Sequence, residues 1–176
     1  MWKDGKKWVY SITYDEGCAA LLDHAVPVHR RYGIPGHVAL VAPQIGVPRN
    51  VPGSSYHGMM ILSKEQIHGL AKEGWGVSCH SMTHPNITDE NAEYEVVESR
   101  KVLEEKLEMP VTIFCVPGSN QNYPASLKVA RKAGYRAILT IYDKVNTQET
   151  DLMCLGRCPL HTEYPEPFFS VFDPYK

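Results

Sequence analysis

Residues 76–85 read GVSCHSMTHP and join a short apolar run to two histidines, His80 and His84, four positions apart. The run 76–79 predicts a short buried strand. Pro85 directly follows the second histidine and favours a loop over a helix there. Two neutral imidazoles this close in the chain can bind one zinc-like ion. Taken alone, such a pair more often consists of polar side chains that cap the end of a strand.

Apolar runs alternate with helical patterns on both sides of this stretch. We expect strands at 8–14, 37–42, 76–79, 111–115 and 136–142. We expect helices at 18–31, shortened or kinked by Pro27, at 63–73, at 88–107 and at 124–134. Strands that alternate with helices predict an α/β fold with a parallel sheet or barrel.

Length and composition bound the protein class. The 176 residues predict a single domain, 1–176, and a formal charge of −2 argues against nucleic acid or a membrane surface as partner. Five cysteines, an odd number, favour a reducing compartment over a disulfide scaffold. The apolar run after the first lysines is too short for a signal peptide, so we expect a cytoplasmic protein or one from which a leader has been trimmed.

A second motif lies at the end of the first expected strand. Asp15, Glu16 and Gly17 follow the run 8–14, and Gly17 permits a sharp turn. The commoner meaning of such a tripeptide is a solvated acidic turn. At the carboxyl end of a parallel strand, however, adjacent carboxylates can divide labour, because one can bind a metal while the other accepts a proton from water.

A third motif, Pro117 and Gly118, follows the expected strand 111–115. A Pro-Gly pair is usually only a turn. At this edge of the sheet it can also direct a backbone N–H toward a developing oxyanion. Together the three motifs have the inventory of a metal-assisted hydrolase.

The three motifs resemble those of the polysaccharide deacetylase family, the NodB-homology domain of carbohydrate esterase family four. TYDEG at 13–17 resembles the family's T-F-D-D-G, and HSMTHP at 80–85 matches its H-[ST]-x-x-H-P. FCVPG at 114–118 resembles its F-R-x-P-Y/G. The resemblance covers most of residues 8–142.

The resemblance implies a distorted (β/α) barrel, which this chain could leave incomplete, and a divalent metal ion, most often zinc. It implies removal of acetyl groups from an N-acetylated amino sugar, oligosaccharide or polysaccharide. The implied roles are Asp15 as general base, Glu16, His80 and His84 as metal ligands, Gly118 as oxyanion donor, and Pro117 as a substrate contact.

The chain departs from the family pattern at several positions. Glu16 stands where the family has an aspartate, and the extra methylene moves a carboxylate by about 1.5 Å. Cys115 stands where many members have an arginine that orients the catalytic aspartate. Residues 146–160 instead resemble a subgroup with an N-T…D…L-x-R-x-P pattern. His161 is a candidate for the general acid, and the alternative is a surface or tail histidine.

Two other functions stay open from the sequence. The chain could hydrolyse a non-sugar C–N bond in a small metabolite, so the substrate is a carbohydrate or a small amide. It could also be an inactive domain that binds carbohydrate or regulates. The tail 161–176 is rich in proline and aromatic residues. It could fold back on its own barrel or cover a neighbouring subunit in a homo-oligomer.

Overall fold

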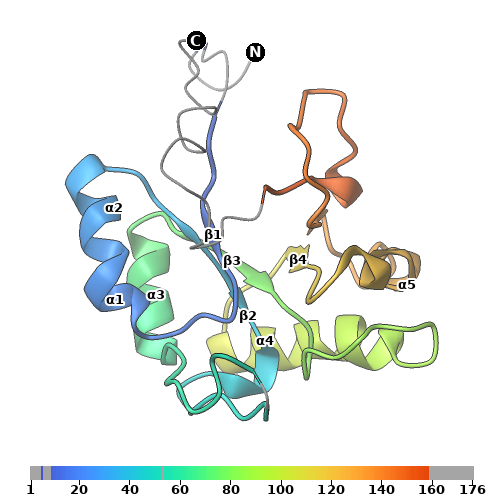
Figure 1. Ribbon diagram of the computed structural model, residues 1–176, viewed down its shortest axis with the longest axis horizontal. Coiled ribbons are helices and arrows are strands. Elements are labelled where there is room, and N and C mark those ends of the chain that lie inside the picture. The colour runs from blue at the N-terminus through green and yellow to red at the C-terminus, as the bar shows by residue number, and fades with distance from the viewer. Residues whose placement is uncertain (1–4, 6–8, 53, 159–176) are drawn as a thin grey trace.

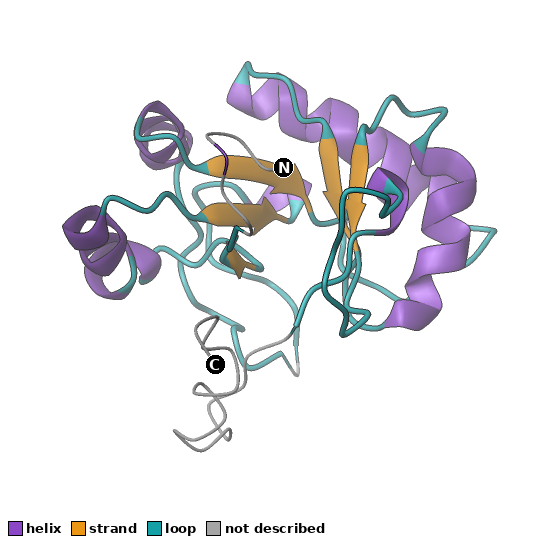
Figure 2. Ribbon diagram, turned by 90° about the horizontal axis from the view of Figure 1, so that it is seen from above, coloured by secondary structure: helices purple, strands orange, loops and turns teal. Residues whose placement is uncertain are grey.

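The computed structural model describes residues 5, 9–52 and 54–158. These residues fold around one parallel sheet. The five strands follow one another across the sheet in chain order: β1 (Thr13–Tyr14), β2 (His37–Leu40), β3 (Gly76–Cys79), β4 (Ile113–Cys115) and β5 (Ala137–Leu139). Seen from above, the sheet curls, so that strands at its two ends run in different directions (Figure 2). The expected α/β class is confirmed, and the curled sheet has the form of a half-barrel.

Helices lie on the outside of the curled sheet (Figure 1). They are α1 (Leu21–His24), α2 (Val26–Tyr32), α3 (Lys64–Lys72), α4 (Ser99–Leu107) and α5 (Tyr123–Ala130). The described residues also form three short 3₁₀ helices, η2 (Ala42–Gln44), η4 (Asn120–Asn122) and η5 (Leu152–Cys154). A π-helical segment, η3 (Glu93–Glu98), precedes α4. No helix in the described ranges has the length and apolar character needed to cross a membrane.

Helix α3 begins as its sequence predicts. The Ser63 hydroxyl accepts a hydrogen bond from the Gln66 backbone N–H at 3.3 Å, and the Gln66 side chain accepts one from the Ser63 N–H at 2.8 Å. This reciprocal pair is a capping box, and it satisfies two backbone donors that the first turn leaves open. The helix ends before Gly74, whose φ of 90° lies in the left-handed region.

Most expected elements differ from the structure at their boundaries, and three of them have a clear physical reason. The strand expected at 8–14 is reduced to β1, because β2 begins at His37, opposite Thr13. The helix expected at 18–31 divides into α1 and α2 around Ala25, with Pro27 in the first turn of α2, where its missing N–H costs least. The helix expected from residue 88 begins instead at η3, with a π-helical turn.

The core fixes the edge of the sheet at which the motifs meet. Val38, Leu40, Phe114 and Ile138 are fully buried in the strands, and Leu103 of α4 is fully buried with them. All five strands are parallel, so the loops that follow their carboxyl ends gather along one edge of the sheet.

Candidate active site

The acidic turn after β1 is held in a constrained conformation. Glu16 and Gly17 have φ angles of 72° and 70°, in the left-handed region. A side chain at Gly17 would also collide with Leu40, whose Cδ2 lies 2.3 Å from the position of a Cβ atom. A glutamate in this region costs about 1–3 kcal/mol, and such strain concentrates at functional sites. The Glu16 side chain is 7% exposed, whereas that of Asp15 is 36% exposed.

His80 is held in one tautomer by its surroundings. The residue is 1% exposed, and its Nδ1 lies 2.9 Å from the carbonyl oxygen of Cys115. A carbonyl can only accept, so Nδ1 carries the proton and donates it, which leaves the lone pair on Nε2. This is the arrangement in which a histidine binds a metal while its other nitrogen is held by the protein.

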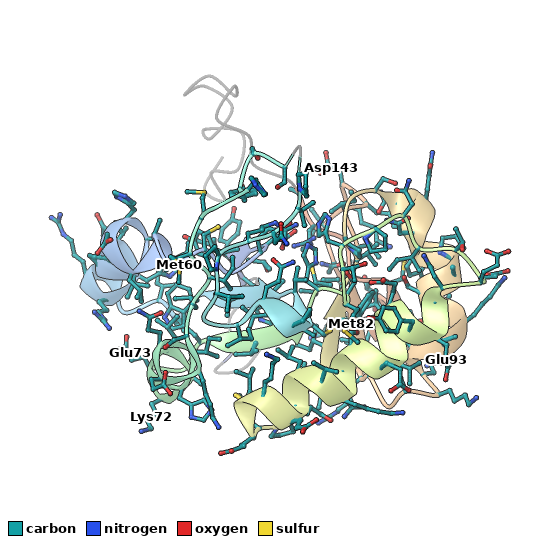
Figure 3. The ribbon with its side chains drawn as sticks, turned by 90° about the horizontal axis from the view of Figure 1, so that it is seen from below. Met60, Lys72, Glu73, Met82, Glu93 and Asp143 are labelled. Carbon is teal, nitrogen blue, oxygen red and sulfur yellow. The ribbon has the colours of Figure 1, made fainter. Side chains whose placement is uncertain are left out.

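The loop between the two histidines is held by a buried carboxylate, Glu95 of η3. Its two oxygens accept hydrogen bonds from the backbone N–H groups of Met82 and Thr83, at 3.0 and 2.9 Å, and from the Thr83 hydroxyl at 2.7 Å. In Figure 3 Met82 lies beside the long helix, near whose end Glu93 is labelled. Ser81 and His84 in this loop have positive φ angles, so the clamp maintains a conformation that costs energy.

We expect Glu95→Gln to lower the free energy of unfolding by about 2 kcal/mol. Both carboxylate oxygens of Glu95 accept hydrogen bonds, and in glutamine one of them is replaced by an NH₂ group, which cannot accept. Chemical denaturation of the metal-free protein measures this loss. Glu93→Gln is the matched control, since Glu93 is exposed on the same turn. Equal unfolding midpoints for the two variants would contradict the clamp.

Glu16, His80 and His84 each offer one ligand atom, and these atoms lie within 4.8 Å of one another. Glu16 Oε1 and His84 Nε2 are 3.1 Å apart. Two ligand atoms about 2.1 Å from a tetrahedral zinc ion are separated by about 3.4 Å, so this pair fits one edge of such a site. The three residues therefore fit a divalent ion.

The protonation states of the two histidines suit metal binding. Burial, with the neighbouring His80, lowers the pKa of His84 to about 4, and burial also lowers the pKa of His80. Both imidazoles are thus neutral near pH 7, as ligands must be. Burial raises the pKa of Glu16 to about 7, against the opposing effect of Arg49. A metal ion would have to replace the proton at Glu16, so metal affinity should fall as the pH drops below about 7.

Asp15, His80 and Cys115 form a second group whose ligand atoms lie within 4.8 Å of one another. This group is less suited to a cation. Both Asp15 oxygens are already bound to the guanidinium of Arg157, which would repel a metal ion. Burial raises the pKa of the Cys115 thiol well above its usual range, so the thiol stays protonated.

Arg157 binds the carboxylate of Asp15, a contact that the sequence pattern at Cys115 did not predict. Its Nη1 and Nη2 donate to the two oxygens of Asp15 at 2.7 and 3.2 Å, and its Nε donates to the carbonyl of Thr140 at 2.9 Å. Burial acts to raise the pKa of Asp15, but His80 and Arg157 outweigh it, and the pKa is lowered. Asp15 is thereby held ionised and in one orientation.

The segment after β5 carries Arg157 to this position. Leu155 pairs in parallel with Leu139 of β5, and its N–H donates to the carbonyl of Ile138 at 2.9 Å. The Asn146 amide holds the next residue, Gly156, by donating to its carbonyl and accepting from its N–H, at 2.9 and 2.8 Å. Asn146 and Arg157, the asparagine and arginine of the N-T…D…L-x-R-x-P pattern, therefore act together. Asn146 holds the segment in place, and the segment brings Arg157 to Asp15.

The Pro-Gly turn is joined to the histidine loop by Asn122, which is buried. The Asn122 amide donates to the carbonyl of Pro117 at 2.8 Å, and its oxygen accepts from the N–H of Ile87 at 2.9 Å. Gly118 is exposed, with a φ of 64°. That the Gly118 N–H donates to an oxyanion stays a prediction, as does the substrate contact of Pro117.

Sequence reasoning named the ligand candidates but missed the residues that hold them. Glu95, Asn122 and Arg49 carry no motif, and Arg157 was noted only as part of a subgroup pattern. His161 and the tail 161–176 lie outside the described residues, so the general acid and the oligomer stay predictions.

Comparisons with a family model and with a curated protein point to the same family. The family model described as polysaccharide deacetylase matches residues 3–138. YxkH of Bacillus subtilis (strain 168) is 24% identical over 149 residues, which are 83% of this chain and 49% of that protein. The chain therefore spans about half the length of this curated relative.

Solved structures share the fold. The Streptococcus pyogenes deacetylase PplD in complex with acetate has a TM-score of 0.74 at 19% identity, covering 97% of this chain and 73% of that one. IcaB from Ammonifex degensii has a TM-score of 0.68 at 23% identity, covering 85% and 66%. At these identities the likeness establishes the half-barrel architecture.

Proposed function

Because the chain belongs to the polysaccharide deacetylase family, we propose that it is a metal-dependent amide hydrolase that removes N-acetyl groups from an amino sugar in an oligosaccharide or polysaccharide. The reaction consumes water and yields acetate and a free amine. The observation that supports it most is the approach of one carboxylate and two histidines to within 4.8 Å, beside a second, ionised carboxylate.

The proposed roles combine this geometry with the family resemblance. Glu16, His80 and His84 would hold a divalent ion, most suitably zinc, which supplies Lewis acidity toward the acetamide carbonyl and the attacking water. Asp15 accepts the proton of the water as the water attacks. The Gly118 N–H donates a hydrogen bond to the oxyanion that forms on the carbonyl carbon.

Arg157 keeps the base ready without taking a proton itself. Its guanidinium stays charged throughout the pH range of interest, and it donates to Asp15 through two parallel hydrogen bonds. This fixes the carboxylate plane and favours its ionised form. In this proposal Arg157 replaces, from a distant segment, the arginine that many family members carry at the position of Cys115.

We expect Arg157→Met to lower turnover near pH 7 by up to about 10²-fold, the scale of a misaligned reacting group. Loss of the guanidinium also raises the pKa of Asp15, so at zinc concentrations that keep the site loaded the acid limb of the pH–rate profile should move to higher pH. Arg30→Met is the matched control, because Arg30 makes a similar two-bond contact with Glu73 on the exposed surface. An acid limb at the same pH in both variants would contradict the role of Arg157.

Acetate release tests the substrate. Zinc-loaded protein is incubated with N-acetylglucosamine oligomers of increasing length and, separately, with small acetamides and other small amides. Release from the oligomers, abolished by a chelator, is the expected result. Hydrolysis of the small amides alone would favour a metabolite-directed hydrolase, and tight zinc binding without hydrolysis of either set would favour an inactive domain.

A further inference from the structure

Among the described residues Arg49 has the largest fully buried side chain, and it lies directly beside the candidate metal ligands. The residue is 1% exposed. Its Nη1 forms a short ion pair with Glu16 Oε2 and donates to the side-chain oxygen of Gln44 at 3.1 Å. Gln44 ends η2, which follows β2, and Glu16 follows β1. Both partners of the guanidinium therefore lie at the edge of the sheet formed by the carboxyl ends of the strands.

The backbone of Arg49 is held by hydrogen bonds, and burial confines the side chain that leaves it. The N–H of Arg49 donates to the carbonyl of Met59 at 2.8 Å, and the carbonyl of Arg49 accepts from Gly58 at 2.9 Å. The returning arm of this hairpin is tied to the acidic turn, because the N–H of Leu62 donates to the carbonyl of Gly17 at 2.9 Å. In Figure 3 Met60, on the same arm, lies beside the first helices.

The two oxygens of Glu16 therefore face different groups. Oε1 lies 3.1 Å from His84 Nε2, on the side of the candidate metal ligands, whereas Oε2 is bound by Arg49. The guanidinium that is paired with Oε2 repels a dication there. Only Oε1 can then serve as a metal ligand.

We propose that Arg49 is a positioning residue that restricts Glu16 to one ligand oxygen. The inference rests on the proposed metal site. Three protein ligand atoms leave the remaining coordination position open for water and substrate, which a catalytic site requires. A carboxylate bound through both oxygens would occupy part of that space. The contact also explains how a glutamate can act as a metal ligand where the family has an aspartate. The longer side chain has more conformational freedom, and its contact with Arg49 restricts that freedom.

Cobalt(II) tests this without reference to turnover. It replaces zinc in such sites, and its visible absorption bands weaken as the coordination number rises. We expect strong bands for the wild type and a loss of intensity for Arg49→Met, in which both Glu16 oxygens can bind the ion. Arg49→Lys, which keeps a cation near Oε2, should retain the wild-type intensity, as should the exposed control Arg30→Met.

A second variant covers the case in which Arg49→Met does not fold, as judged by circular dichroism. Arg49→Gln keeps a polar side chain of shorter reach but removes the cation beside Oε2, so the same loss of band intensity is expected. An unchanged cobalt spectrum in the folded variants would overturn the role of Arg49 and leave the proposed metal site standing. Failure of the wild type to bind cobalt would overturn both.

Discussion

Asp15→Asn is expected to retain the metal and to lose about 10²-fold or more in the rate of acetate release, the usual scale for a general base. An asparagine amide cannot accept the proton of the attacking water, yet it keeps the shape of the aspartate. The metal ligands of the proposal are other residues, so metal content should not change. Single-turnover acetate release and metal analysis of the purified variant measure the two quantities.

The same variant separates catalysis from stability. Asp15→Asn leaves Arg157 with a neutral partner, so the free energy of unfolding should also fall, and thermal unfolding must be measured at the assay temperature. A folded, metal-loaded Asp15→Asn protein that turns over at the wild-type rate would assign the base to another residue.

Combined replacement of His80 and His84 by alanine is expected to abolish metal binding and reduce acetate release to background. Two of the three proposed ligands are lost, and a single carboxylate does not hold zinc at micromolar concentration. The change also leaves the carbonyl of Cys115 without the donor that His80 provides, which costs about 1–3 kcal/mol.

Zinc binding, followed by competition with a chromophoric chelator, measures this loss, and circular dichroism verifies that the fold persists. His57→Ala is the control, because His57 is exposed and lies outside the ligand group. Zinc bound by the double variant with wild-type affinity would place the metal elsewhere in the molecule.

The fold and the candidate ligands were predictable because they depend on local signals. Each motif follows an apolar run, and the parallel arrangement brings the ends of such runs together. The capping box that begins at Ser63 is a four-residue pattern that identified the start of α3. The boundaries of β1 and α4 were not predictable in this way, since they depend on where β2 begins and on the π-helical turn that presents Glu95.

The supporting residues could not be predicted because their partners are distant in the chain. Arg157 contacts a carboxylate 142 positions earlier. Arg49 lies in a segment rich in proline and glycine that predicts only a loop, yet it is among the most buried side chains of the described residues. Cys115 suggested a missing arginine, whereas the structure supplies the guanidinium from beyond β5. The contact exists only once the sheet has formed.

A zinc titration with a turnover assay at each point tests the central claim most directly. Metal-free protein receives increasing zinc, bound zinc is measured, and acetate release from an N-acetylglucosamine oligomer is followed in the same samples. The account predicts that the rate rises in proportion to occupancy and reaches its maximum at one ion per chain. Acetate release by the metal-free protein at the full rate, or none at full occupancy, would contradict it.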